Sequence, residues 1–87
     1  MPKLECLALE GLEAWFNSND HLPPHFHVEK PGEWEVRVFF LQSAENMIEV
    51  KWGRELRAKE MRAITDGAAT MRAELLREWS AKVAMEK

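Results

Sequence analysis

The amino-acid sequence predicts a small α+β domain, in which an antiparallel sheet of three or four strands packs against one long C-terminal helix. Two observations support this prediction. Residues 12–52 alternate apolar and polar side chains with a period of two, which is typical of half-buried antiparallel strands. From residue 57 onward, apolar residues recur every three or four positions, which indicates an amphipathic helix. The 87 residues are expected to form a single domain.

Four segments alternate and are expected to be strands: residues 12–18, 25–30, 34–40 and 47–52. Leu4–Leu9 is a further candidate edge strand. The core face is expected to carry Leu12, Ala14, Phe16, Phe26, Val28, Trp34, Val36, Val38, Phe40, Ile48, Val50 and Trp52. The opposite, solvated face is expected to carry His25, His27, Glu29, Glu35, Arg37, Glu49 and Lys51, flanked by Trp15 and Phe39.

The turn at Pro31-Gly32 sets the register of the second and third strands. A two-residue loop would pair Val28 with Glu35 and bury that carboxylate, because paired residues share a face. We therefore predict a loop of three or five residues. In that register Val28 lies opposite Trp34 or Val36, and His27 lies opposite Glu35 or Arg37.

The helix is expected over about residues 57–83, with an apolar stripe of Met61, Ile64, Ala68, Met71, Leu75 and Trp79. Unbroken, it would be about 40 Å long, whereas a six-residue strand spans about 20 Å. The overhang would leave Leu76 and Trp79 uncovered. Either the helix breaks near Gly67 or a second subunit covers these residues. We favour a single, kinked helix and a homodimer.

Composition limits the classes of function. The net charge of −3 argues against a dedicated nucleic-acid-binding protein, although a local basic patch is compatible with it. Cys6 is the only cysteine, so an intramolecular disulfide is excluded, which fits a reducing cytosol. No apolar run is long enough to span a membrane, and the start MPKLECLALE lacks the apolar segment of a secretory signal. We therefore expect a cytoplasmic protein.

All three histidines lie in the segment NDHLPPHFHVE, residues 19–29. His25 and His27 are two positions apart on an expected strand, so their rings leave the same face. The adjacent prolines stiffen the return of His21 toward them. Zinc, iron, nickel and copper accept three imidazoles with a carboxylate from Asp20, Glu29 or Glu35. The sequence thus predicts a ligand site at Asp20, His21, His25 and His27, whose three histidines bind a metal, zinc first.

A structural interpretation of the same histidines stays open. His21 and His25 could hydrogen-bond to loop carbonyls, and Asp20 could cap the turn. His27 could pair with Glu29 or Glu35 on a solvated face. The spacing H-x3-H-x-H does not decide between the two, because it lacks the fixed geometry of stronger metal motifs.

Motifs for nucleophilic catalysis or phosphate binding are absent: the sequence has no G-x-S-x-G, G-x-G-x-x-G or G-x-x-x-x-G-K-[ST]. HFHV is similar to the motif of histidine-triad nucleotide hydrolases, but Glu29 stands where that motif needs a further histidine. The remaining enzymatic hypothesis is acid–base chemistry on a phosphoester by His27, Glu35 and Arg37. Whether the protein is an enzyme is left open by the sequence.

A second functional class is a non-enzymatic, dimeric module that binds protein or RNA. Dimerisation would use helix residues such as Leu76 and Trp79. A basic cluster near the start of the helix could face phosphates, or could be a solvated face balanced by Glu55 and Glu60. The cluster consists of Lys51, Arg54, Arg57, Lys59 and Arg62.

The stretch DHLPPHFHV, residues 20–28, resembles the signature D-H-x-P-P-H-x-H of a bacterial family catalogued as domain of unknown function 4160. Met1-Pro2, Gly11–Phe16 and the helix residues Arg72, Glu74, Leu75 and Trp79 also match its pattern. The resemblance implies an α+β fold, a site of unknown chemistry, and a place in small gene pairs similar to toxin–antitoxin modules, with a partner protein encoded by a neighbouring gene. The residues that it marks are Asp20, His21, Pro23, Pro24, His25 and His27.

Overall fold

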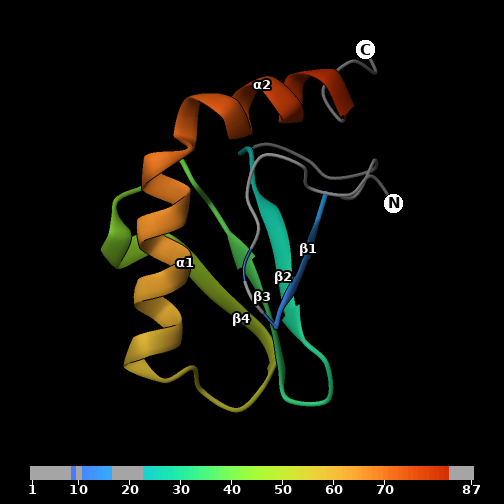
Figure 1. The fold of residues 1–87 in the computed structure, drawn as a ribbon, viewed down its shortest axis with the longest axis vertical. Helices are drawn as coiled ribbons and strands as arrows, with labels where there is room; N and C mark the ends of the chain where they lie inside the picture. The colour runs from blue at the N-terminus through green and yellow to red at the C-terminus, as the bar shows by residue number, and fades with distance from the viewer. Residues whose placement is uncertain (1–8, 10, 17–22, 83–87) are drawn as a thin grey trace.

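The computed structural model describes residues 9, 11–16 and 23–82. Its elements are β1 (Glu13–Trp15), β2 (Phe26–Lys30), β3 (Trp34–Val38), the 3-10 turn η1 (Ala44–Asn46), β4 (Ile48–Gly53), α1 (Ala58–Thr70) and α2 (Arg72–Lys82). The strands form one antiparallel sheet in the order β1-β2-β3-β4. In Figure 1, α1 runs alongside the sheet and α2 turns across the sheet's upper end. The predicted α+β fold is confirmed.

The strands lie where the alternation predicts them; the first three are shorter than predicted, and the fourth keeps its length but is shifted by one residue. The first strand ends at Trp15, and the end of its predicted range falls outside the described residues. The third ends at Val38, two residues before the predicted limit. The candidate strand at Leu4–Leu9 also lies outside the described residues except for Leu9, which is not in a strand.

The β2–β3 hairpin has the predicted odd-length loop. Lys30 pairs with Trp34, so three residues form the loop. In this register Val28 lies opposite Val36 and His27 lies opposite Arg37. The apolar face of the hairpin stays continuous as a result, which is the physical reason that an odd loop was expected.

The core lies between the sheet and the helices. β2 contributes Phe26 and Val28, and all three apolar residues of β3 point inward. α1 covers this layer with Ile64 and Ala68. The buried apolar residues are Phe16, Phe26, Val28, Trp34, Val36, Val38, Phe40, Met47, Ile64, Ala68, Leu75 and Trp79.

The prediction for the last strand is wrong at two of three core positions. A bulge in β4 shifts the register, so that Val36 lies opposite Val50 while Glu35 lies opposite Trp52. Lys51 is the extra residue, and it moves Trp52 onto the face of Glu35. Val50 and Trp52 are 46% and 44% exposed. Val50 stays solvated because β4 is an edge strand of the described sheet.

The helix breaks, and it does so four residues after Gly67. Met71 leaves helical geometry with φ −103° and ψ 22°, and separates α1 from α2. The preference for one kinked helix is therefore wrong. Backbone hydrogen bonds continue through the break, because Met71 N–H donates to the Gly67 carbonyl and Leu75 N–H to the Met71 carbonyl. The change of direction therefore breaks few backbone hydrogen bonds.

The break buries Trp79, one of the two residues that a straight helix would have left uncovered, together with Leu75. Leu75 is fully buried, and the Trp79 ring packs edge-on against Phe16 with centroids 6.0 Å apart. Arg72 Nε donates to the Phe40 carbonyl over 2.8 Å, which anchors the start of α2. Leu76 remains exposed. The overhang that suggested a homodimer is thus absent from the described chain.

Neither α1 nor α2 is long and apolar enough to cross a membrane, and the same holds for the whole described part of the chain.

Candidate functional site

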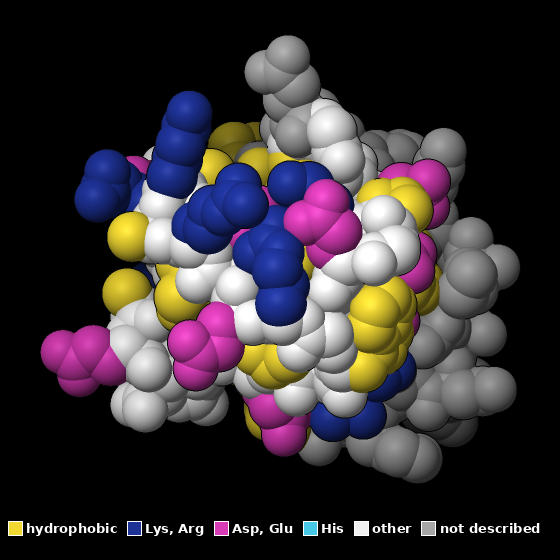
Figure 2. Space-filling model, turned by 90° about the horizontal axis from the view of Figure 1, so that it is seen from below, with side chains coloured by type: hydrophobic (Ala, Val, Ile, Leu, Met, Phe, Trp, Pro, Cys, Tyr) yellow, Lys and Arg dark blue, Asp and Glu magenta, His cyan; other side chains and the backbone are white. Residues whose placement is uncertain are grey.

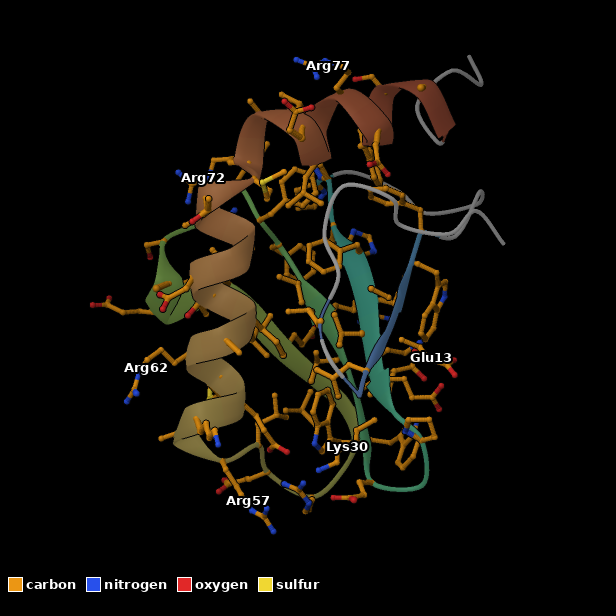
Figure 3. The ribbon with its side chains drawn as sticks, in the orientation of Figure 1. Glu13, Lys30, Arg57, Arg62, Arg72 and Arg77 are labelled. Atoms are coloured by element: carbon orange, nitrogen blue, oxygen red, sulfur yellow. The ribbon has the colours of Figure 1, made fainter. Side chains whose placement is uncertain are left out.

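The sheet face opposite the core carries two rows of polar and aromatic side chains. Strand alternation and the observed register place them side by side. The first row runs across the four strands as Glu13, Glu29, Glu35 and Trp52, and the second as Trp15, His27, Arg37 and Glu49. The bulge adds Trp52 to this face. The rows contain these residues of the predicted face: His27, Glu29, Glu35, Arg37 and Glu49, with Trp15 beside them. The label of Glu13 in Figure 3 marks the β1 end of the first row.

His25 and His27 lie together at the end of this face that is nearest α2. Their ring centroids are 5.2 Å apart, and the rings meet edge to face. The two side chains are only 7% and 2% exposed, so the expectation of an exposed pair is wrong. The cause is aromatic packing: Trp15 stacks on His27 at 5.5 Å, and Phe39 and Trp79 pack on His25 at 5.0 and 5.8 Å.

The tautomer of His25 follows from its hydrogen bond to the loop. Nδ1 lies 2.9 Å from the Pro23 carbonyl oxygen, which can only accept, so Nδ1 carries the proton. Nε2 therefore carries the lone pair of the neutral ring. This contact is the carbonyl bond that the structural interpretation expected of His25. It is equally the arrangement by which proteins orient a histidine that binds a metal through Nε2.

His27 faces a carboxylate on the neighbouring strand. Its Nδ1 lies 3.9 Å from Glu35 Oε2. The same Glu35 oxygen is 3.1 Å from the Lys51 ammonium, and Glu35 Oε1 accepts a 3.2 Å hydrogen bond from Trp52 Nε1. Sequence reasoning missed the role of Trp52, since only the bulge in β4 brings it to this face.

The three candidate catalytic residues are brought together only in part. His27 and Glu35 face each other, whereas the Arg37 guanidinium turns to Glu49 and donates to its Oε1 over 3.1 Å. Glu29 lies opposite Glu35 and Glu13 in the ladder. The structure thus brings His27 and Glu35 together. Arg37 lies opposite His27 on the neighbouring strand, but its guanidinium is paired with Glu49.

Asp20 and His21, the other two predicted site residues, lie outside the described residues. Within residues 9, 11–16 and 23–82, no three His, Cys, Asp or Glu side chains gather in a way that could hold a metal ion. The described part of the predicted metal site is therefore the pair of imidazoles.

The predicted basic cluster is partly neutralised within the chain. Arg54 donates to Glu33 and to Glu60, and Lys51 pairs with Glu35. Figure 2 shows Lys and Arg side chains gathered with acidic ones at the lower end of the molecule. In Figure 3, Arg57 lies at this end and Arg62 points away from the sheet. The cluster is therefore a mixed-charge surface around the start of α1.

The charged groups around Arg54 hold each other ionised. Hydrogen bonds from Arg54 and the Arg57 backbone N–H lower the pKa of Glu60 from 4.5 to about 2. Arg54 likewise lowers the pKa of Glu33, and these two carboxylates raise the pKa of the Arg54 guanidinium. These shifts belong to a structural network at the β2–β3 hairpin and the start of α1.

Comparison with protein families decides what the chain belongs to. The model of the family described as "Domain of unknown function (DUF4160)" matches residues 11–80. The chain is a member of the DUF4160 family. The match covers every strand and nearly all of both helices, and it includes the segment with the three histidines. For this DUF4160 chain, comparisons with curated proteins and with solved structures found no match.

Proposed function

We propose that this DUF4160 chain binds a divalent transition metal, zinc first, through the Nε2 atoms of His25 and His27. The observation that supports the proposal is the contact between the two imidazoles on one sheet face, with ring centroids 5.2 Å apart. Neutral imidazole nitrogens are the commonest ligands of zinc and also suit copper, iron and nickel. His21, with Asp20 beside it in sequence, is proposed as the further ligand.

Burial of the two rings favours a binding role over simple packing. Apolar side chains would fill this space at lower cost, because buried imidazole nitrogens must be compensated by hydrogen bonds or ligands. The surrounding rings of Trp15, Phe39 and Trp79 would hold the imidazoles in place and exclude water.

The test is calorimetry with Zn²⁺ on the untagged wild type and on His25→Phe and His27→Phe, which keep an aromatic ring but lose the nitrogens. We expect saturable binding by the wild type, and at least about tenfold weaker binding by each variant. Phe39→Leu alters the packing on His25 without removing a ligand atom, and serves as the matched control. Zn²⁺ binding by His21→Ala tests whether His21 supplies a third ligand.

Visible absorption of the Co²⁺ form would report nitrogen ligands directly. Equal Zn²⁺ affinity in the wild type and both histidine variants would reject the metal site.

A second proposal is an interaction module of a toxin–antitoxin-like gene pair. The edge strand β4 favours it, because this strand leaves Val50 and Trp52 exposed at the side of the described sheet. Such an edge can accept a strand from another chain. Co-expression with the protein encoded by the neighbouring gene tests the partner, and sedimentation velocity tests the homodimer. A monomer with no stable complex would reject this proposal.

A further inference from the structure

We infer that β4 pairs antiparallel with β4 of a second copy of this chain, about a two-fold axis that passes through Val50. The two sheets would then join into one continuous sheet. This inference rests on the second proposed function, the interaction module, and names both its partner and the register of pairing. The direction of the backbone groups of β4, its pattern of charges and its exposed apolar side chains support it.

The outward backbone groups of β4 belong to Ile48 and Val50. Among the described residues only β3 pairs with β4, so the other side of the strand is an edge. Phe39 N–H donates to the Met47 carbonyl over 2.7 Å, which makes these residues a hydrogen-bonded pair at the end of the β3–β4 ladder. Hydrogen-bonded and non-hydrogen-bonded pairs alternate along an antiparallel ladder. Glu49 therefore turns its N–H and C=O toward β3, whereas Ile48 and Val50 turn theirs outward.

A two-fold axis at Val50 uses these outward groups and pairs opposite charges. Val50 of each copy would donate its N–H to the Val50 carbonyl of the other, which makes two hydrogen bonds across the axis. The same register places Glu49 of one copy opposite Lys51 of the other, and symmetry repeats this contact on the other side of the axis.

Other registers of the two copies are less favourable. An axis at Glu49 or at Lys51 would place that residue opposite its own copy, and like charges directly opposite are destabilising. A shift by one residue would place Val50 opposite a charged side chain and so mix the two faces of the sheet. Of the axes at residues 49–51, only the one at Val50 therefore pairs opposite charges.

Charges on the outer face would alternate in sign across the junction. Within one chain, Arg37 Nη1 lies 3.1 Å from Glu49 Oε1, and Lys51 Nζ lies 3.1 Å from Glu35 Oε2. The joined sheet would carry the row Arg37, Glu49, Lys51 of the second copy and Glu35 of the second copy, in which every neighbour has the opposite charge. The side chains of Glu49 and Lys51 are 57% and 31% exposed, so both can reach a second chain.

These charges also make the edge selective. A lysine on an edge strand usually discourages pairing with other chains. Here Glu49 removes that cost for a copy of this chain in the Val50 register, because it meets Lys51 of the second copy.

The exposed valine of β4 gains cover in the same arrangement. Val50 is 46% exposed in the single chain, although it lies opposite the buried Val36 on the core side of the sheet. In the pair it would pack against Val50 of the second copy. The bulge at Lys51 limits the paired stretch to about residues 48–52. Because so short a junction buries little surface, the dimer should dissociate on dilution.

Charge reversals on β4 test the register. Glu49→Lys would place lysines opposite each other across the axis, and Lys51→Glu would place glutamates opposite each other. In sedimentation velocity the wild type should show a concentration-dependent dimer, and each variant alone should dimerise at least about tenfold more weakly. An equal mixture of the two variants should recover dimerisation, because every charge beside the axis then faces an opposite one. Recovery would also show that both variants are folded.

Two charge reversals away from β4 are the controls. Glu13→Lys lies on β1, at the other end of the strand order. Arg62→Glu lies on α1, where the side chain points away from the sheet (Figure 3). Both should leave dimerisation within about twofold of the wild type, as expected for surface charges outside the junction.

Failure of this inference can be told apart from failure of the interaction module. A monomeric wild type that binds the protein encoded by the neighbouring gene rejects self-pairing and keeps the module. A wild-type dimer that neither Glu49→Lys nor Lys51→Glu weakens is formed by another surface, which rejects pairing at β4. Variants that weaken the dimer and do not recover it when mixed reject the Val50 register. A monomeric wild type without a partner rejects both the module and the pairing.

Discussion

At the scale of single residues, Gly53 occupies a backbone position at the end of β4 that requires glycine. It ends β4 with a φ of +98°, a region that side chains rarely adopt. A Cβ at this position would lie 2.1 Å from the Glu33 carbonyl oxygen and 2.5 Å from the Trp34 Cα. The chain approaches the hairpin this closely because the next residue, Arg54, donates its backbone N–H to that carbonyl over 3.1 Å.

Replacing Gly53 with alanine should therefore be severely destabilising. We expect Gly53→Ala to lower the free energy of unfolding by more than about 3 kcal/mol, because backbone strain and a clash with fixed backbone atoms add. Gly32→Ala is the control, since Gly32 has a similar φ of +80° but open space around it. Its cost should be about 1–2 kcal/mol. Urea unfolding measures both, and equal losses would contradict the steric explanation.

At the scale of elements, α2 is the segment whose position depends most on packing. Its core contacts come from Leu75 and Trp79, and the Trp79 ring touches both Phe16 and His25. The same ring therefore links α2 to the residue that follows β1 and to the residue that precedes β2. In Figure 3 the opposite side of α2, with Arg77, points away from the rest of the molecule.

Two truncations on α2 should separate packing within the chain from packing between chains. Trp79→Ala should cost about 3–5 kcal/mol, as expected for removing a buried large aromatic side chain. Leu76→Ala should cost less than about 1 kcal/mol, because Leu76 is exposed in the single chain. Chemical unfolding followed by circular dichroism gives both values. A loss at Leu76 as large as that at Trp79 would instead indicate that another subunit buries this residue.

At the scale of the whole molecule, one charged network ties the hairpin, the β4–α1 connection and α1 together. Glu60 Oε2 lies 3.0 Å from Arg54 Nη2 and 3.2 Å from Lys30 Nζ, while Arg54 also binds Glu33. Glu60 in addition accepts the Arg57 backbone N–H over 2.8 Å, which satisfies one donor at the start of α1. The network therefore couples helix initiation to hairpin position.

This network predicts a loss of stability in acid. The pKa of Glu60 is lowered from 4.5 to about 2 in the folded chain, so its contribution is full above pH 4.5 and disappears as the pH falls toward 2. At pH 7, Glu60→Gln should lower the free energy of unfolding by about 1–3 kcal/mol, the usual range for hydrogen bonds to charged groups. At pH 2, where about half of the Glu60 carboxylates in the folded chain are protonated, most of this difference should be gone.

Unfolding curves measured across the acid range would check this. Glu55→Gln, an exposed neighbour, is the control and should leave the pH dependence as it is. The remaining acid sensitivity of Glu60→Gln should come partly from Glu33, whose pKa is lowered by Arg54. A constant difference between Glu60→Gln and the wild type from pH 7 to pH 2 would exclude the proposed linkage.

The sequence by itself determined the features that depend on local periodicity. Alternation over β2 and β3, together with the need to keep Glu35 out of the core, predicted the odd-length loop and left Trp34 or Val36 as the partner of Val28; the structure selects Val36. The segment with the three histidines predicted the family, which the match to residues 11–80 confirms. It also placed His25 and His27 on one face, because side chains two apart on a strand share a face whatever surrounds them.

Only the tertiary structure decided the features that depend on contacts between residues far apart in the sequence. The bulge at Lys51 exists only relative to β3, and it moved Trp52 from the core to Glu35. The helix breaks at Met71 because Leu75 and Trp79 gain burial against the end of the sheet, a gain that no pattern within the helix records. The imidazoles are buried because rings from β1 and α2 pack on them. Periodicity sets which face a side chain joins, but contacts between elements set whether that face meets water.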